Sequence, residues 1–105
     1  MNSKRIKKGF RHGDVLVIRT HRIPKTAKLL DHLVLAEGEV TGHAHVVHGD
    51  ASLYEMNGLL YLKVHNDEAF LKHEEHDPIN LPKGSYLIRK QREYDPQKLV
   101  KEVVD

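Results

Sequence analysis

An Asn57-Gly58 dipeptide lies between two runs, Ala51–Met56 and Leu59–Val64, and is the strongest local signal for a β-hairpin in the sequence. Both residues tolerate the positive φ angles of a tight hairpin turn. Further runs rich in β-branched residues are separated by turn residues. They cover residues 15–18, 33–36, 40–48 and 85–91. This spacing predicts an all-β fold, a small single-domain β-sandwich or barrel of about seven short strands with at most one or two short helices.

Three segments keep more than one interpretation. Residues 20–31 contain Pro24 and fit either a loop or a short helical turn. Residues 66–76 fit a helix capped by Asn66 or Asp67, or a strand over 69–73 followed by an acidic loop. Residues 97–104, which follow Pro96, fit a short helix or an edge strand. The sequence therefore leaves the helical content of these segments open.

The chain has 105 residues, which suits one hydrophobic core and leaves no room for a second. We expect a flexible basic N-terminal segment over residues 1–11, with Lys4, Arg5, Lys7 and Lys8, and a single β-rich domain over 12–105. Cysteine is absent, so disulfides and thiolate ligands are excluded. A chain without cysteine suits a reducing compartment, and we expect a cytoplasmic protein. No apolar run is long enough to predict a membrane span.

Two histidine motifs carry the strongest chemical signal. His43 and His45 lie two positions apart in an expected strand, so their side chains should share one face. The second motif, His73-Glu74-Glu75-His76, adds two imidazoles and two carboxylates. Imidazole is a common metal ligand, and zinc, iron, manganese and nickel accept such mixtures of nitrogen and oxygen. We therefore predict that the motifs meet in space and bind a divalent transition metal.

In this interpretation His43 and His45, with one or both of His73 and His76, hold the ion. Glu75 is a candidate general base or a fourth ligand, and the sequence does not decide between these roles. The alternative for each motif is a polar, hydrated surface. The other histidines are scattered, and we expect them at the surface: His12, His21, His32, His48 and His65.

Two other functions remain open. Arg89, Arg92 and Tyr94 lie close together in the sequence and suit phosphate or nucleic-acid binding by a metal-free protein whose histidines act as acid and base. The net charge of +2 argues weakly against a dedicated nucleic-acid binder. A non-catalytic interaction module is the other alternative. We expect the partner to be a small-molecule or nucleic-acid substrate of unknown identity, and we expect no binding to membranes. A homo-oligomer is compatible with the sequence.

From Gly38 onward the chain resembles the cupin family, in which a glycine precedes a His-X-His strand, a later glutamate and a Pro-X-Gly turn. Gly38, His43, His45, Glu55 and Pro82-Lys83-Gly84 follow this order. The resemblance implies a cupin-like β-barrel, with a metal held by a rearranged ligand set that draws on His73 and His76. The segment from Gly38 to Pro96 is also similar to a small bacterial family of unassigned function.

Overall fold

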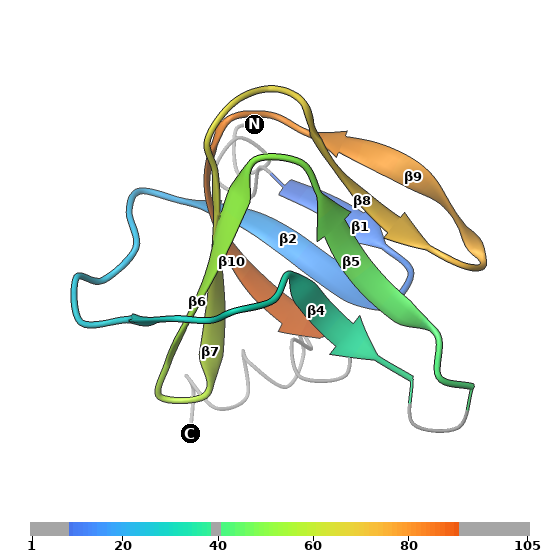
Figure 1. The fold of residues 1–105 in the computed structure, drawn as a ribbon, viewed down its shortest axis with the longest axis horizontal. Coiled ribbons are helices and arrows are strands. Elements are labelled where there is room, and N and C mark those ends of the chain that lie inside the picture. The colour runs from blue at the N-terminus through green and yellow to red at the C-terminus, as the bar shows by residue number, and fades with distance from the viewer. Residues whose placement is uncertain (1–8, 39–40, 91–105) are drawn as a thin grey trace, which may run out of the picture.

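The computed structural model describes residues 9–38 and 41–90, and it places ten strands in two antiparallel sheets (Figure 1). The described residues contain no helix, and therefore none that could cross a membrane. The strands are β1 (Gly9–His12), β2 (Val15–Thr20), β3 (Lys28–Leu29), β4 (Val34–Glu37), β5 (Ala44–His48), β6 (Ala51–Met56), β7 (Leu59–Val64), β8 (Ala69–His73), β9 (His76–Leu81) and β10 (Gly84–Lys90).

The strands form a sandwich with one core between two sheets. A six-stranded sheet has the order β1-β2-β10-β7-β6-β3, and a four-stranded sheet has the order β4-β5-β8-β9. Each sheet sends alternate residues into the core, as shown by fully buried Val15 and Val17 on β2, and by Ala69 and Leu71 on β8. Each such Val or Leu stabilises the fold by roughly 1.5–3 kcal/mol. The predicted all-β fold is confirmed, and of the two predicted forms, sandwich or barrel, the structure has the sandwich.

The Asn57-Gly58 hairpin forms as predicted. Met56 pairs with Leu59 across the turn, and the two strands stay in register up to the pair of Ala51 and Val64. Asn57 and Gly58 have φ angles of 53° and 82°, the left-handed values that a two-residue turn of this kind requires. This turn fixes which residues of β6 and β7 face the core.

The strand count differs from the expected seven because polar or very short segments also pair. The strand expected over 40–48 begins at Ala44, since Thr41 lies in a turn and Gly42 has a φ of 74°. The segment 66–76 adopts the strand alternative, and His76 starts a further strand. Residues 20–31 include the short strand β3. The segment 97–104 lies outside the described residues.

The described end of the basic N-terminal segment belongs to the sheet. Gly9 pairs with Ile18, and His12 pairs with Val15, so β1 and β2 form a hairpin. Gly13 in its turn has a φ of 64°, which glycine adopts without a steric penalty. The expectation of a flexible lead-in over 1–11 is therefore wrong for Gly9–Arg11, because β1 supplies an edge strand.

Candidate metal centre

Histidines continue three core-facing rows of the sandwich at one end of the molecule. On β8, His73 follows buried Ala69 and Leu71 at the two-residue strand spacing. On β5, His45 occupies the same face as buried Val47. On β1, His12 ends the strand. His12 and His45 are only 3% and 5% exposed, so the apolar core changes there into a polar cluster.

A β-bulge adds His76 to the cluster. Leu71 pairs with Ile79, and His73 pairs with His76. Between these two pairs the chain advances two residues on β8 but three on β9. The extra residue lies on β9 and reverses the alternation of that strand. His76 therefore shares a side with His73, and their ring centroids are 4.7 Å apart. Without the bulge, His76 would lie on the opposite face of the sheet.

The two histidine motifs of the sequence meet in space. Ring centroids lie 5.6 Å apart for His43 and His73, and 4.2 Å apart for His45 and His73. His45 and His76 stack at 5.9 Å. Two imidazoles that share one tetrahedral ion have centroids separated by roughly 5 Å, given metal–nitrogen bonds near 2.0–2.1 Å. These spacings are thus compatible with a common ion. The turn of β1 and β2, the start of β5 and the turn of β8 and β9 gather at the right of Figure 1.

A chain of hydrogen bonds sets the protonation of His45. The Nε2 of His12 lies 2.9 Å from the carbonyl oxygen of Asp77, which can only accept, so this Nε2 carries a proton. A neutral His12 therefore has its lone pair on Nδ1. That atom lies 3.0 Å from Nδ1 of His45, which must donate. The Nε2 of His45 is then left with a free lone pair, as a metal ligand requires.

The imidazole rings of His12 and His45 both favour the neutral state. Burial, reinforced by the charges of His73 and His12, lowers the pKa of His45 to about 4, although Asp14 partly opposes this. Burial also lowers the pKa of His12, against the hydrogen bond to Asp77. Near neutral pH the His45 lone pair is thus available. It lies 3.5 Å from an oxygen of Asp14, itself an acceptor.

His43, His73 and Glu74 form the most compact group of ligand atoms. One atom from each side chain lies within 4.8 Å of the others. The backbone N–H of Ala44 donates to Oε1 of Glu74 at 3.0 Å, and this bond lowers the pKa of the carboxyl group and holds it beside the histidines. Glu74 was not singled out as a ligand in the sequence, because a turn residue follows no alternation.

His43 contains a buried nitrogen without a hydrogen bond. Its Nδ1 is sealed from solvent and has no partner of suitable geometry. The Oε2 atom of Glu75 is 3.3 Å away, close enough for an ion pair but not aligned for a hydrogen bond. An orphaned nitrogen of this kind is uncommon in a native structure and calls for a partner. A cation bound by the ring, or a small rotation of Glu75, would supply one.

Glycine at position 13 lets the rings approach the β1–β2 turn. A Cβ atom there would lie 2.6 Å from Nε2 of His76 and 3.1 Å from Cε1 of His45. Both rings therefore close over the backbone of Gly13. Any larger residue would have to displace an imidazole.

The predicted site residues have different locations in the structure. His43, His45, His73 and His76 come together, and Glu75 is exposed beside His43. Arg89 lies on β10 in the six-stranded sheet, while Arg92 and Tyr94 lie outside the described residues.

Sequence reasoning placed His12 at the surface, and this was wrong, because β1 carries its side chain inward. One feature of the sequence could have indicated the inward position. His12 lies two residues after Phe10, at the spacing that puts both side chains on one strand face, and just before the Gly13-Asp14 turn. Surface positions are confirmed for His21, His32, His48 and His65.

The cupin-type order of residues does not gather in one place. Glu55 lies on β6 and pairs with Leu60 in the six-stranded sheet, whereas the histidine motifs belong to the four-stranded sheet. Pro82 and Lys83 form the turn before β10, where the Pro82 carbonyl accepts a hydrogen bond from the Tyr86 hydroxyl at 2.6 Å. Glu55 and the strand that follows the Pro-X-Gly turn therefore belong to the six-stranded sheet.

Comparison with known proteins yields one family. Residues 11–91 match the family described as Domain of unknown function (DUF8820). No curated protein and no solved structure matches the chain. The matched range begins inside β1, ends just after β10 and contains all five histidines of the cluster. The protein is therefore a member of the DUF8820 family of domains of unknown function.

Proposed function

We propose that this protein binds a divalent transition metal through His43, His73 and Glu74, with Nε2 of His45 as a fourth ligand. The observation that carries the proposal is the compact group of ligand atoms from the first three residues. Two imidazoles and a carboxylate, completed by a third imidazole, form a donor set that zinc accepts. Iron, manganese and nickel accept similar sets.

The electrostatics of the cluster favour a cation. The lone pair on Nε2 of His45 faces the Asp14 carboxylate at 3.5 Å. Both groups are hydrogen-bond acceptors, so no hydrogen bond joins them. The buried Nδ1 of His43 also lacks a hydrogen-bond partner. A divalent ion would replace the His45–Asp14 contact between two acceptors, and the missing partner of His43, with bonds to one positive centre. Protonation of the same rings would instead place several like charges a few ångströms apart.

Metal binding should change the hydrogen bonding of His73. Its Nδ1 accepts a hydrogen bond from the backbone N–H of Glu75 at 3.0 Å, so the neutral ring carries its proton on Nε2. An ion held by Nε2 would require the proton on Nδ1, and the bond from the N–H of Glu75 would then be lost. The Glu74–Glu75 turn would then rearrange on metal binding. The amide of Glu75 is a direct reporter of this step.

The exposed carboxylates indicate a role for the ion. Glu74 and Glu75 lie at the solvent side of the cluster, so water can reach the ion from there. A bound divalent metal acts as a Lewis acid and lowers the pKa of coordinated water. Glu75, next to His43, would accept a proton from that water. With the four proposed protein ligands a tetrahedral zinc ion would be fully coordinated. The proposed function is therefore a metal centre in which an ion that accepts more than four ligands, such as iron or manganese, keeps an open position for a small-molecule or nucleic-acid ligand.

Calorimetric titration of the chelator-treated full chain tests this proposal. Zn²⁺, Mn²⁺, Ni²⁺ and Fe²⁺ are added separately, and we expect at least one to bind with one ion per chain. The variant with His43→Ala and His73→Ala should lose at least about 100-fold in affinity, because it removes two metal ligands. The variant with His48→Ala and His65→Ala removes two exposed histidines and is the matched control. Equal loss in both variants, or no binding by the wild type, contradicts the proposal.

A further inference from the structure

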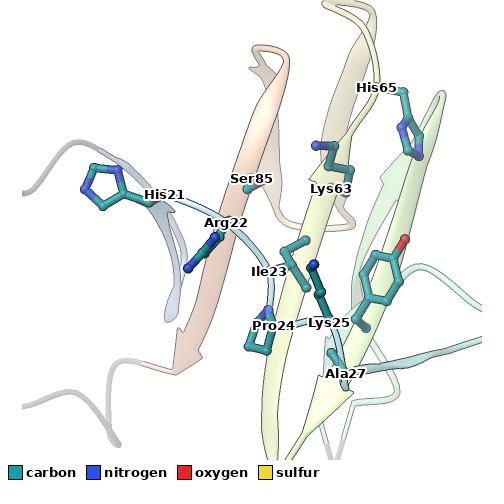
Figure 2. A pocket seen from close by; sticks show the side chains of 10 residues that line it. His21, Arg22, Ile23, Pro24, Lys25, Ala27, Lys63, His65 and Ser85 are labelled. Carbon is teal, nitrogen blue, oxygen red and sulfur yellow. The ribbon is translucent and has the colours of Figure 1, made fainter.

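A second site lies on the outer face of the six-stranded sheet, away from the histidine cluster. The loop between β2 and β3 crosses this face and, with β6, β7 and β10, lines an open cavity of about 370 Å³ (Figure 2). Six residues of β2 separate the loop from the turn near the histidines, a length of ~20 Å. The cavity is therefore distinct from the proposed metal centre.

Three permanent cations line the cavity. Arg22 and Lys25 come from the loop, and Lys63 comes from β7 (Figure 2). Lys63 lies between buried Leu62 and Val64, so strand alternation directs it outward. No carboxylate lines the cavity, and these three cations form no ion pair with any residue in the described part of the chain. Uncompensated positive charge of this kind attracts an anionic ligand.

The remaining walls provide polar and apolar contacts. The hydroxyl-bearing Tyr54 and Ser85 line the cavity, and Ser85 pairs directly with Lys63 across the sheet. Ile23, Pro24 and Ala27 add an apolar wall. An aromatic ring beside an apolar wall can hold a flat organic group, while the cations and hydroxyls bind phosphate oxygens.

The loop beside the cavity is held at its turn and on the β3 side of that turn. The N–H of Ala27 donates to the carbonyl oxygen of Pro24 at 3.1 Å, and the hydroxyl of Thr26 donates to Sδ of Met56 at 3.2 Å. Just beyond β3, the N–H of Leu30 donates to the Leu53 carbonyl at 2.8 Å. The cavity is thus formed before a ligand arrives, which lowers the entropy cost of binding.

We infer that this cavity binds a nucleoside phosphate or a phosphorylated small molecule of similar size. Its volume lies within the range of small-molecule sites, about 300–1,000 Å³. Arg22, Lys25 and Lys63 bind the phosphate, and Tyr54 with the apolar wall holds the organic part. This site is independent of the proposed metal function.

Calorimetry on the chelator-treated full chain tests the inference with AMP, adenosine and inorganic phosphate as probes. AMP should bind more tightly than either of the others, because only AMP uses both parts of the cavity. Lys63→Gln and Arg22→Gln should each weaken AMP binding at least about tenfold, since each removes a charge-assisted contact. Lys72→Gln, on an exposed position of β8 in the other sheet, removes the same charge and should change the affinity less than twofold.

The variant with His43→Ala and His73→Ala should bind AMP like the wild type. Loss of AMP binding in that variant, with no effect of Lys63→Gln, would place the anion at the histidine cluster and overturn the inference. Equal binding of AMP and adenosine, or of AMP and inorganic phosphate, would overturn the assigned ligand class. A single-stranded oligonucleotide that binds more tightly than AMP and responds to the same variants would assign the surface to nucleic acid instead.

Discussion

Hydrogen bonding gives the histidines of one cluster different roles. His12 donates a hydrogen bond to the backbone carbonyl of Asp77 through Nε2 and accepts one from His45 through Nδ1. It therefore orients the ring of the proposed ligand His45 without being a ligand itself. Ligand histidines commonly donate their second ring N–H to such a partner, which fixes the tautomer and the orientation. His43 and His73 lack this kind of support in the metal-free state.

Replacing His12 by Leu should weaken metal binding by roughly 10- to 100-fold, the usual cost of losing the partner of a ligand histidine. Leucine fills the buried position with an apolar side chain, so the domain should still fold. His48→Leu, at an exposed site on β5, is the control. Calorimetry measures the affinity, and ¹⁵N spectra of the imidazoles report the His45 tautomer. An unchanged affinity with an altered tautomer would show that His12 does not position the ligand.

The metal-free protein should lose stability as the pH falls from about 6.5 to about 4. The pKa of His45 is lowered from 6.5 to about 4, so between these values the unfolded chain binds a proton that the folded chain does not. This difference corresponds to at most about 3 kcal/mol. The free energy of unfolding from urea titrations at several pH values checks this. The His45→Gln variant should show a flatter profile, and an identical slope in both proteins would contradict the assignment.

Two local features of the strands build the cluster. The bulge between β8 and β9 turns His76 toward His73, and the tight β1–β2 turn brings Gly13 under the rings of His76 and His45. The site therefore depends on backbone geometry at two turns as much as on the histidines. Substitution of a turn glycine can separate these contributions.

Gly13→Ala should weaken metal binding and also lower the free energy of unfolding. Gly58→Ala should lower the free energy of unfolding without weakening metal binding. Both glycines have positive φ angles, 64° and 82°, so alanine costs about 1–2 kcal/mol of backbone strain at either position. A Cβ at Gly13 would meet His76 at 2.6 Å, whereas nothing lies within 4 Å at Gly58. Thermal denaturation and metal titration of both variants check this. Equal metal affinities would contradict the role of Gly13.

The sequence predicted those parts of the structure that follow from strand alternation and turn chemistry. The Asn57-Gly58 hairpin and the core-facing rows are of this kind. The meeting of His43 with His73 was expected only because the chain can fold back between the two motifs. The contribution of His12 was not predictable in the same way, because it depends on an edge strand that pairs through only four residues. The orientation of His76 depends on a bulge, which leaves no mark in the residue pattern.

At the scale of the molecule, the cluster connects both sheets. His43, His45 and His73 belong to the four-stranded sheet or its flanks, while His12 ends the first strand of the six-stranded sheet. The His12–His45 hydrogen bond joins the sheets beyond the end of the apolar core. A metal bound there would hold β5, the β8–β9 hairpin and, through His12, the β1–β2 hairpin together.

Metal at 100 times its dissociation constant should therefore raise the melting temperature of the protein. Ligand binding to the folded state alone adds about 2.7 kcal/mol at this concentration. For a domain of about 100 residues this corresponds to an increase on the order of 10 °C. Differential scanning calorimetry with and without metal measures it. The double variant His43→Ala and His73→Ala should show no increase, and an equal increase in that variant would point to metal bound elsewhere.

The location of the ion is the most direct test of the account. Crystals of the full chain grown with zinc, and measured on both sides of the zinc absorption edge, reveal the metal by its anomalous scattering. We predict one peak bound by nitrogen atoms of His43 and His73 at about 2.0–2.1 Å. Glu74 and Nε2 of His45 should complete the coordination. A zinc-loaded crystal with no peak between these side chains, or with its main peak at exposed histidines such as His21 or His65, would contradict the account.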